Sequence, residues 1–255
     1  MPEKETVAVL GTGDMGDSFG PKLAKLGYRI VYGSRNPDSG KMARLLEHTG
    51  NGSVAATYRD AARSADIVLL ALPWHAIEQI VASLGDMEDK IVIDLAWPES
   101  RIAEDGYDEL TLSQSGAETI QQWLPNAMVV KAFGTTASNV IDNPDVAGGL
   151  VSVPIASDHK RAKEVTARIA AELGLDPVDA GPLRMARYIE GMMVLYMVPH
   201  YQGQSTGWEF YFRRSNYWMC NEYTGGELDG DAPPVVDAGN LAEIPDTHGE
   251  PEPCP

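Results

Sequence analysis

The sequence predicts an α/β protein in which a doubly wound parallel sheet is followed by a smaller C-terminal domain and an extended acidic tail. Three observations lead to this fold class. Short apolar segments alternate with helical patterns over the first 135 residues, and such alternation indicates a parallel sheet with helices on both faces. A glycine-rich loop joins the first apolar segment to the first helical pattern. The last part of the chain is rich in Pro, Gly and acidic residues.

The predicted strands of the first part are short, apolar and bounded by turn or cap residues. They cover residues 6–10, 29–32, 67–72, 91–95 and 128–132. Between them, residues 14–26 and 76–84 repeat apolar side chains at helical spacing, so both segments are predicted to be helices.

Beyond residue 149 the pattern is looser but of the same kind. Residues 149–156 are predicted to form a strand, and 157–174 a helix with Ser157 as its N-cap. A short strand and turn follow at 176–183, and an apolar helix rich in Met follows at 183–197.

The expected division of the chain has three parts. These are a dinucleotide-binding domain over 1–136, a C-terminal domain for substrate and dimer contacts over 137–223, and an acidic tail over 224–255. The formal net charge is −17, and no Lys or Arg follows Arg214. The excess acidity therefore belongs to the end of the chain, whose composition is typical of disorder.

Composition and charge exclude several classes of function. A strongly negative chain does not suit the phosphate backbone of nucleic acid. No long apolar run is present, and the charged start MPEKE leads straight into a strand, so neither a membrane span nor a signal peptide is expected. The two cysteines, Cys220 and Cys254, are too few for a disulfide framework. A cytoplasmic protein is therefore expected, with a bridge between these two cysteines left open.

The loop after the first strand, in VAVLGTGDMG, contains the pattern G-x-G-x-x-G at Gly11, Gly13 and Gly16. These glycines serve a tight turn, close approach of the backbone to a pyrophosphate, and close packing of helix on strand. The pyrophosphate would lie at the positive N-terminus of the following helix. Because strand, loop and helix occur in the required order, we expect a Rossmann-type dinucleotide site. Its remaining loop residues are Thr12, Asp14 and Met15.

The end of the second strand, in VYGSRNP, indicates which dinucleotide is bound. An acidic residue there would bind the ribose diol of NAD and repel a 2′-phosphate. This chain instead has Ser34, Arg35 and Asn36, and an Arg can make a bidentate, charge-assisted contact to phosphate. The sequence therefore predicts NADP(H) as the cofactor.

Several blocks together resemble the deazaflavin (coenzyme F420)-dependent NADP reductase family, whose members transfer hydride between NADP and a deazaflavin coenzyme. The blocks are VAVLGTGDMG with YGSRNP, DIVLLALPWHAI, KIVIDLAWP, MVVKAFGTT and LGLDPVDAGPLRMARYIEGM, in the family's order over roughly residues 5–197. The resemblance implies a Rossmann-type domain with a small C-terminal domain, an NADP-dependent oxidoreductase activity and, often, a homodimer.

The resemblance also implies positions for residues of the site. Those that would border the cofactor are Leu72, Pro73, His75, Ala96 and Trp97, the last beside the acceptor as well. Those that would form the floor of the acceptor pocket are Lys131, Ala132 and Phe133.

Two positions depart from the family pattern. Ala96-Trp97-Pro98 stands where the family commonly has Asn-Pro, and Gly134 stands where it commonly has Asn. Both changes remove an amide near the acceptor. Two alternatives to a deazaflavin acceptor therefore stay open: an NADPH-dependent imine or carbonyl reductase of a biosynthetic pathway, and an NADP-sensing protein without turnover.

Hydride transfer requires a nicotinamide ring held face to face with an acceptor ring, C=N or C=O. A carbonyl or imine would also need a proton donor. The candidates are His75, His200, Tyr188, Tyr196 and Tyr201. His75 is the predicted catalytic residue, because it follows a strand at the edge where α/β sheets bind ligands.

Met and aromatic residues are dense between 185 and 218, which suits a lid over a flat acceptor. The pocket residues expected from this segment are Met197, His200, Tyr201 and Trp208. The sequence contains no metal-ligand spacing and no serine-hydrolase elbow. It thus predicts a reductase that transfers hydride between NADP(H) and a small-molecule acceptor, with the deazaflavin coenzyme as the candidate co-substrate.

Overall fold

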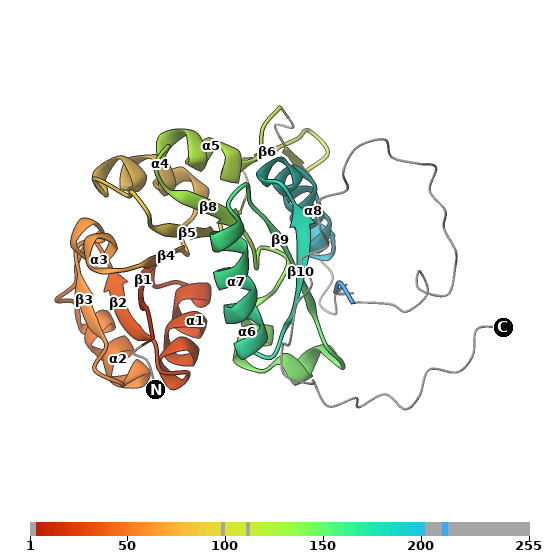
Figure 1. Ribbon diagram of the computed structural model, residues 1–255. Coiled ribbons are helices and arrows are strands. Elements are labelled where there is room, and N and C mark those ends of the chain that lie inside the picture. The colour runs from red at the N-terminus through yellow and green to blue at the C-terminus, as the bar shows by residue number, and fades with distance from the viewer. Residues whose placement is uncertain (1–3, 98–99, 111–112, 202–210, 214–255) are drawn as a thin grey trace. The chain divides into compact units, whose positions relative to one another are not determined.

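The structure is a computed structural model and describes residues 4–97, 100–110, 113–201 and 211–213 (Figure 1). Residues up to Arg213 form one compact unit. For a few residues in these ranges only the backbone is described: Arg101, Asp108, Met197, Pro199, His200 and Tyr201. The predicted acidic tail over 224–255, the pocket residue Trp208 and both cysteines lie outside the described residues.

A central sheet of eight strands runs through this unit in the order β10-β9-β8-β5-β4-β1-β2-β3. Its strands are β1 Thr6–Leu10, β2 Arg29–Gly33, β3 Val54–Ala56, β4 Ile67–Leu70, β5 Ile91–Asp94, β8 Met128–Lys131, β9 Ser152–Ala156 and β10 Asp176–Gly181. All neighbouring pairs are parallel except β8 and β9. The chain winds outward from β1 to β3 and then returns to β4, which confirms the predicted doubly wound sheet.

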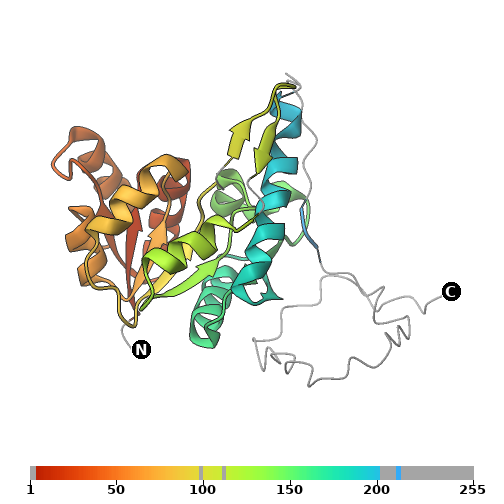
Figure 2. The same cartoon turned by 90° about the horizontal axis from the view of Figure 1, so that it is seen from above.

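Helices cover both faces of this sheet (Figure 1). They are α1 Asp14–Lys25, α2 Gly40–Thr49, α3 Tyr58–Ser64, α4 Trp74–Ser83, α5 Gly116–Trp123, α6 Ser138–Asp142, α7 Lys160–Glu172 and α8 Ala186–Tyr201, with short 3-10 turns at Pro144–Ala147 and Leu183–Met185. A separate antiparallel hairpin, β6 Ser100–Ile102 and β7 Asp108–Leu110, stands away from the sheet in both views (Figures 1 and 2). No helix among the described residues is long and apolar enough to span a membrane.

Two hydrophobic cores lie on opposite faces of the sheet, because successive strand residues point to opposite sides. Val7 and Val9 of β1 pack in the core that includes Phe19 of α1 and Ile169 of α7. The intervening Ala8 packs in the other core, with residues of α3, α4 and α5. Burial on both faces explains why the predicted strands read as continuous apolar runs.

The five strands predicted in the first part are all present, although the third to fifth end one or two residues earlier than expected. The prediction of Ser157 as an N-cap is wrong: α7 begins at Lys160 after His159. The Ser157 hydroxyl donates to the carbonyl oxygen of Val129 at 2.6 Å, so it joins two strands instead.

The predicted domain boundary at residue 136 falls inside a continuous sheet. β9 and β10 come after this boundary and extend the sheet beyond β8. The helix predicted for 183–197 is present as α8, which contacts α5. The division at 136 therefore stays a prediction about function, while the described backbone up to Arg213 forms one unit.

Candidate active site

The glycine loop between β1 and α1 has two glycines that the chain itself requires. Gly11 has φ +112°, and a Cβ there would collide with the carbonyl oxygen of Ala71. A Cβ at Gly16 would collide with the carbonyl oxygen of Gly11. At Gly13, however, no protein atom lies within 4 Å of an added Cβ. The absence of a side chain at Gly13 thus leaves open space at the start of α1 for a bound group to approach the backbone.

The N-terminus of α1 is open to such a group. Gly13 is its N-cap residue and provides no side-chain hydrogen bond, so the side chain that usually caps a helix start is missing. Free backbone N–H groups and the positive end of the helix dipole favour an anion there. Two exposed acids, Asp14 and Asp17, also lie in this first turn.

A cavity of about 580 Å³ lies beside the loop, toward α2. Its lining residues are Thr12, Gly13, Asp14, Asp17, Lys41, Arg44, Leu45 and His48. The Lys41 ammonium donates to the carbonyl oxygen of Thr12 at 2.7 Å. Lys41, Arg44 and His48 follow one another at helical spacing, so α2 presents basic side chains to the loop. Sequence reasoning missed these residues, although their spacing could have revealed them once α2 was recognised.

The residues predicted to bind the 2′-phosphate follow β2. Arg35 and Asn36 are exposed, and the Ser34 hydroxyl accepts the backbone N–H of Asn36 at 3.1 Å. This bond holds the turn in which all three residues lie. With Lys41 nearby on the same side of the loop, the turn provides the donors that a phosphate group needs.

A second cavity, of about 340 Å³, lies where β1, β4, β5 and β8 end and where α8 passes. Its lining residues are Gly13, Asp14, Met15, Ala71, Leu72, Pro73, Leu95, Ala96, Trp97, Phe133, Gly134, Thr135, Thr136, Ala137, Met193 and Tyr196. These residues include no Lys, Arg or His. The walls are mainly apolar, and Gly13 and Asp14 line both cavities.

Most predicted pocket residues line this second cavity, among them Met15, Leu72, Ala96, Trp97 and Phe133. Phe133 has φ +61°, an uncommon conformation for a bulky residue that costs about 1 kcal/mol or more. Its ring packs edge-on against Phe19 with ring centroids 5.0 Å apart. A strained backbone held in place by packing is typical of a ligand-binding wall.

The prediction that Lys131 forms the floor of the acceptor pocket is wrong. Its side chain is 0 % exposed and lies beneath the cavity wall. The ammonium donates to Asp94 Oδ2 at 2.9 Å and to the carbonyl oxygen of Ala96 at 2.7 Å, and it lies 3.3 Å from Glu190 Oε1. Burial lowers the pKa of Lys131, but the two carboxylates outweigh burial and raise it above its ordinary value. Burial raises the pKa of Glu190, with Lys131 opposing the shift.

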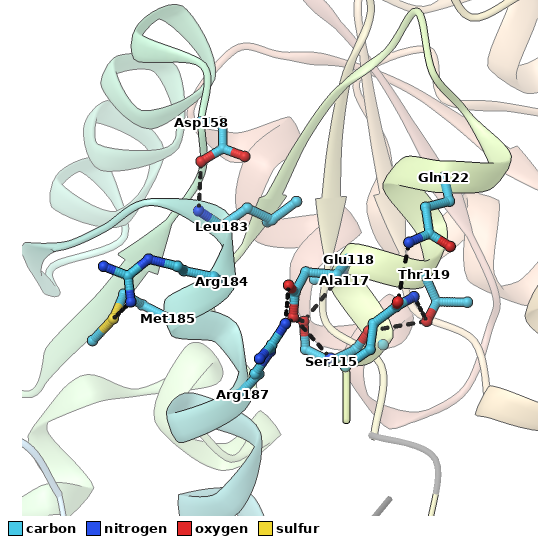
Figure 3. A network of polar contacts seen from close by, with 12 residues as sticks. Ser115, Ala117, Glu118, Thr119, Gln122, Asp158, Leu183, Arg184, Met185 and Arg187 are labelled. Atoms are coloured by element: carbon cyan, nitrogen blue, oxygen red, sulfur yellow. Dashed lines mark hydrogen bonds and ion pairs between the residues drawn. The ribbon is translucent and has the colours of Figure 1, made fainter. Parts of the chain in front are cut away.

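A polar network joins α5 to α8 near this buried group, as Figure 3 shows. Ser115 and Glu118 form a capping box at the start of α5. Arg187 of α8 donates two hydrogen bonds to the Glu118 carboxylate, both at 2.7 Å (Figure 3). These bonds, together with those from Ser115, hold the pKa of Glu118 at about 2 against the opposing effect of burial.

Comparison with known proteins agrees with this geometry. The family model for coenzyme F420-dependent NADP oxidoreductases matches residues 6–98. The F420-dependent NADP reductase of Methanothermobacter thermautotrophicus is 33% identical over 201 residues, which cover 72% of this chain and 84% of that protein. The chain belongs to the F420-dependent NADP reductase family. It is therefore an NADP-dependent oxidoreductase, and NADP(H) is its cofactor.

Other relatives agree with the assignment to this reductase family. A candidate F420-dependent NADP-reductase from Arthrobacter sp. FB24 has a crystal structure that matches with a TM-score of 0.73 at 26% identity, over 83% of this chain and all of that one. The metalloreductase STEAP3 of Rattus norvegicus is 28% identical over 74% of this chain. The chain spans only about a third, 36%, of that longer protein.

The residues of this reductase fit NADP(H). Gly13 provides the open backbone for a pyrophosphate. On the second cavity, Thr136 is 4 % exposed and its hydroxyl has no hydrogen-bond partner. A buried hydroxyl without a partner costs free energy, so a bound amide or ribose that satisfied it would be stabilised. The first and second cavities meet at Gly13, as a dinucleotide that crosses the loop requires.

The structure does not bring the predicted proton donors of this reductase together. His75 is exposed in the first turn of α4 and is not among the lining residues, so we assign it no catalytic role. Tyr188 is 67 % exposed and also lies off the cavity. Tyr196 is the candidate that lines the cavity. The side chains of His200 and Tyr201 lie outside the described set, as does that of the predicted pocket residue Met197.

Proposed function

We propose that this reductase transfers hydride between NADPH and the deazaflavin ring of coenzyme F420. The observation that carries the proposal is the mainly apolar cavity at the strand ends, which continues the cofactor loop and is closed by α8. A flat, aromatic acceptor suits apolar walls that hold two rings in contact and exclude water. The relative from Methanothermobacter supports the same acceptor by its name.

The chain's own residues would act by binding and orientation. The N–H groups at the start of α1 would hold the pyrophosphate, and Ser34, Arg35 and Lys41 would hold the 2′-phosphate. Thr136 would donate to or accept from the polar edge of the nicotinamide end. When bound, NADPH supplies the hydride, so the protein needs no nucleophile of its own.

The carbonyl or imine alternative would need an acid that protonates the product. On the cavity wall only the hydroxyls of Thr135, Thr136 and Tyr196 can transfer a proton near neutral pH, apart from Asp14 at the cofactor loop. Their ordinary pKa values are far above the range that suits a general acid without further activation. This absence of a tuned acid among the described wall residues favours the deazaflavin acceptor.

A homodimer and a cytoplasmic location are further parts of the proposal. Helix α8 is apolar on its exposed side, with Tyr188 67 % and Leu195 53 % exposed. Large apolar side chains that share one helix face suit contact with a second copy. A chain with two cysteines and a nicotinamide cofactor suits a reducing compartment.

The proposal is tested by NADPH oxidation with the purified protein under anaerobic conditions. Oxidised coenzyme F420, free flavin mononucleotide, a cyclic imine and a ketone are compared at equal concentration. We expect turnover with coenzyme F420 and at most slow turnover with the others. Turnover with the imine or ketone alone would contradict the proposal, because it would mean that the acceptor site is built for protonated products.

A further inference from the structure

The wall of the second cavity at Ala96 is held by two buried charges. The Asp94 carboxylate accepts the backbone N–H of Ala96 at 2.8 Å through Oδ1. Its other oxygen accepts from Lys131, which in turn donates to the carbonyl oxygen of Ala96. The peptide groups on both sides of Ala96 are therefore fixed by one ion pair, just where the chain leaves β5 and lines the cavity.

Glu190 extends this pair to a different part of the fold. Its side chain is buried, and it lies 3.3 Å from the Lys131 ammonium. Its carboxylate also accepts the first N–H groups of α5, from Gly116 at 3.0 Å and from Ala117 at 3.3 Å. Gly116 leaves room for this approach, since a Cβ there would lie 2.7 Å from the Trp74 ring.

Glu190 stands on α8, which forms the opposite wall of the same cavity. Met193 is one turn further along this helix, and Tyr196 nearly two turns, and both line the cavity. The sulfur of Met193 lies against Gly134. The position and rotation of the α8 wall are therefore set by the residue that also touches Lys131.

A buried cluster with two acids and one base is a costly way to stabilise a fold. Apolar side chains of similar volume would commonly stabilise a core as well or better, and removal of one partner leaves an uncompensated charge. The cluster does offer a fixed geometry between β5, β8, α5 and α8, because charged hydrogen bonds constrain both distance and direction.

We infer that Glu190 is a positioning residue for hydride transfer. Through Lys131 and Asp94 it fixes the Ala96 wall, beside which the nicotinamide would lie, relative to the α8 wall, against which the acceptor would lie. Hydride transfer is sensitive to the separation of the two reacting atoms, so loosening this link slows the chemical step more than it weakens cofactor binding. The inference rests on the proposed function in that both place hydride transfer in this cavity.

The test compares Glu190→Gln with the matched control Glu118→Gln. Both changes neutralise one carboxylate between α5 and α8, but Glu118 contacts Arg187 and Ser115 and has no contact with Lys131 among the described interactions. For each variant three quantities are measured: the NADPH Kd, the fluorescence of bound NADPH, and kcat with its isotope effect when the transferred hydrogen is deuterium.

For Glu190→Gln we expect an NADPH Kd within about twofold of the original, a changed emission of bound NADPH, and a kcat lower by about tenfold or more with a larger isotope effect. For Glu118→Gln we expect lower thermal stability with unchanged emission, kcat and isotope effect. Equal loss of kcat in the two variants, or an unchanged kcat in Glu190→Gln, would overturn the inference.

Glu190→Asp decides the matter if Glu190→Gln does not fold. It keeps the charge that Lys131 needs but shortens the reach by one methylene, so a positioning role predicts slow turnover in a folded protein. A role limited to charge compensation predicts turnover like the original, which would refute the inference. If the original protein oxidises NADPH with another acceptor, the proposed function fails, and the same variants are compared with that acceptor.

Discussion

The sulfur of Met193 occupies the space that a side chain at Gly134 would need, since a Cβ at Gly134 would lie 2.6 Å from it. Gly134 stands where relatives commonly carry Asn, so this chain has exchanged an amide on the cavity wall for a thioether from α8. The pair links the strand end after β8 to the C-terminal half of α8. It gives the acceptor wall an apolar surface in place of a polar one.

This relationship predicts the outcome of restoring the amide. Gly134→Asn should overpack the cavity against Met193, with a loss of about 1–3 kcal/mol in the free energy of unfolding and a higher KM for the acceptor. The double variant Gly134→Asn with Met193→Ala should recover much of both, measured by denaturant unfolding and steady-state kinetics. Additive losses in the double variant would show that the two residues do not compete for one space.

The glycine loop predicts that two similar changes have different effects. Gly13→Ala should leave stability nearly unchanged, because an added Cβ meets no protein atom within 4 Å. It should weaken NADPH binding about tenfold or more, or at least ~1.4 kcal/mol. Gly11→Ala should cost about 1–3 kcal/mol of stability from its backbone conformation alone. Calorimetry for binding and urea unfolding for stability check both, and equal behaviour of the two variants would contradict the assignment of Gly13 to the ligand.

The 2′-phosphate site predicts a selective loss of affinity. Arg35→Ala should raise the Kd for NADPH about tenfold to a hundredfold, since a hydrogen bond to a charged group contributes about 1.5–3 kcal/mol. The Kd for NADH, which lacks the phosphate, should change little. Arg63→Ala is a suitable control, because Arg63 is an exposed arginine paired with Asp60 on α3. Equal weakening of NADPH and NADH binding by Arg35→Ala would place Arg35 outside this site.

The ion pair between α5 and α8 predicts a defined pH dependence of stability. The pKa of Glu118 is lowered from 4.5 to about 2, chiefly by the hydrogen bonds from Arg187. A carboxyl group with a lowered folded-state pKa stabilises the fold above its unfolded pKa, and this contribution is lost as the pH falls toward the folded value. The difference in Tm between the original protein and Glu118→Gln should be constant at neutral pH and should shrink between about pH 4.5 and 2. A difference that grows over this range would refute the assignment.

The strands and the cofactor loop could be predicted because local pattern decides them. Apolar runs such as 67–72 and the glycine spacing after β1 leave few alternative structures. Helices α2 and α3 were missed because they are short and only partly buried, so their apolar residues form weak patterns. The basic face of α2, with Lys41 and Arg44, was missed for the same reason.

The buried ion cluster could not be predicted from local pattern at all. Asp94, Lys131 and Glu190 are far apart in the sequence, and each stands on an element whose neighbours are decided by the sheet order. A lysine at a strand end is exposed in most proteins, and only the two carboxylates explain its burial here. His75 was placed by its strand end, but α4 begins at Trp74 and turns the residue toward solvent.

The most direct test of the central claim follows one hydrogen. NADPH that carries deuterium at the transferred position of the nicotinamide is incubated with the protein and oxidised coenzyme F420, and the reduced deazaflavin is examined by mass spectrometry. The account predicts that the deuterium is found in the deazaflavin, because the two rings lie in contact in the cavity closed by α8. Failure to oxidise NADPH, or reduced deazaflavin that contains only solvent hydrogen, would contradict it.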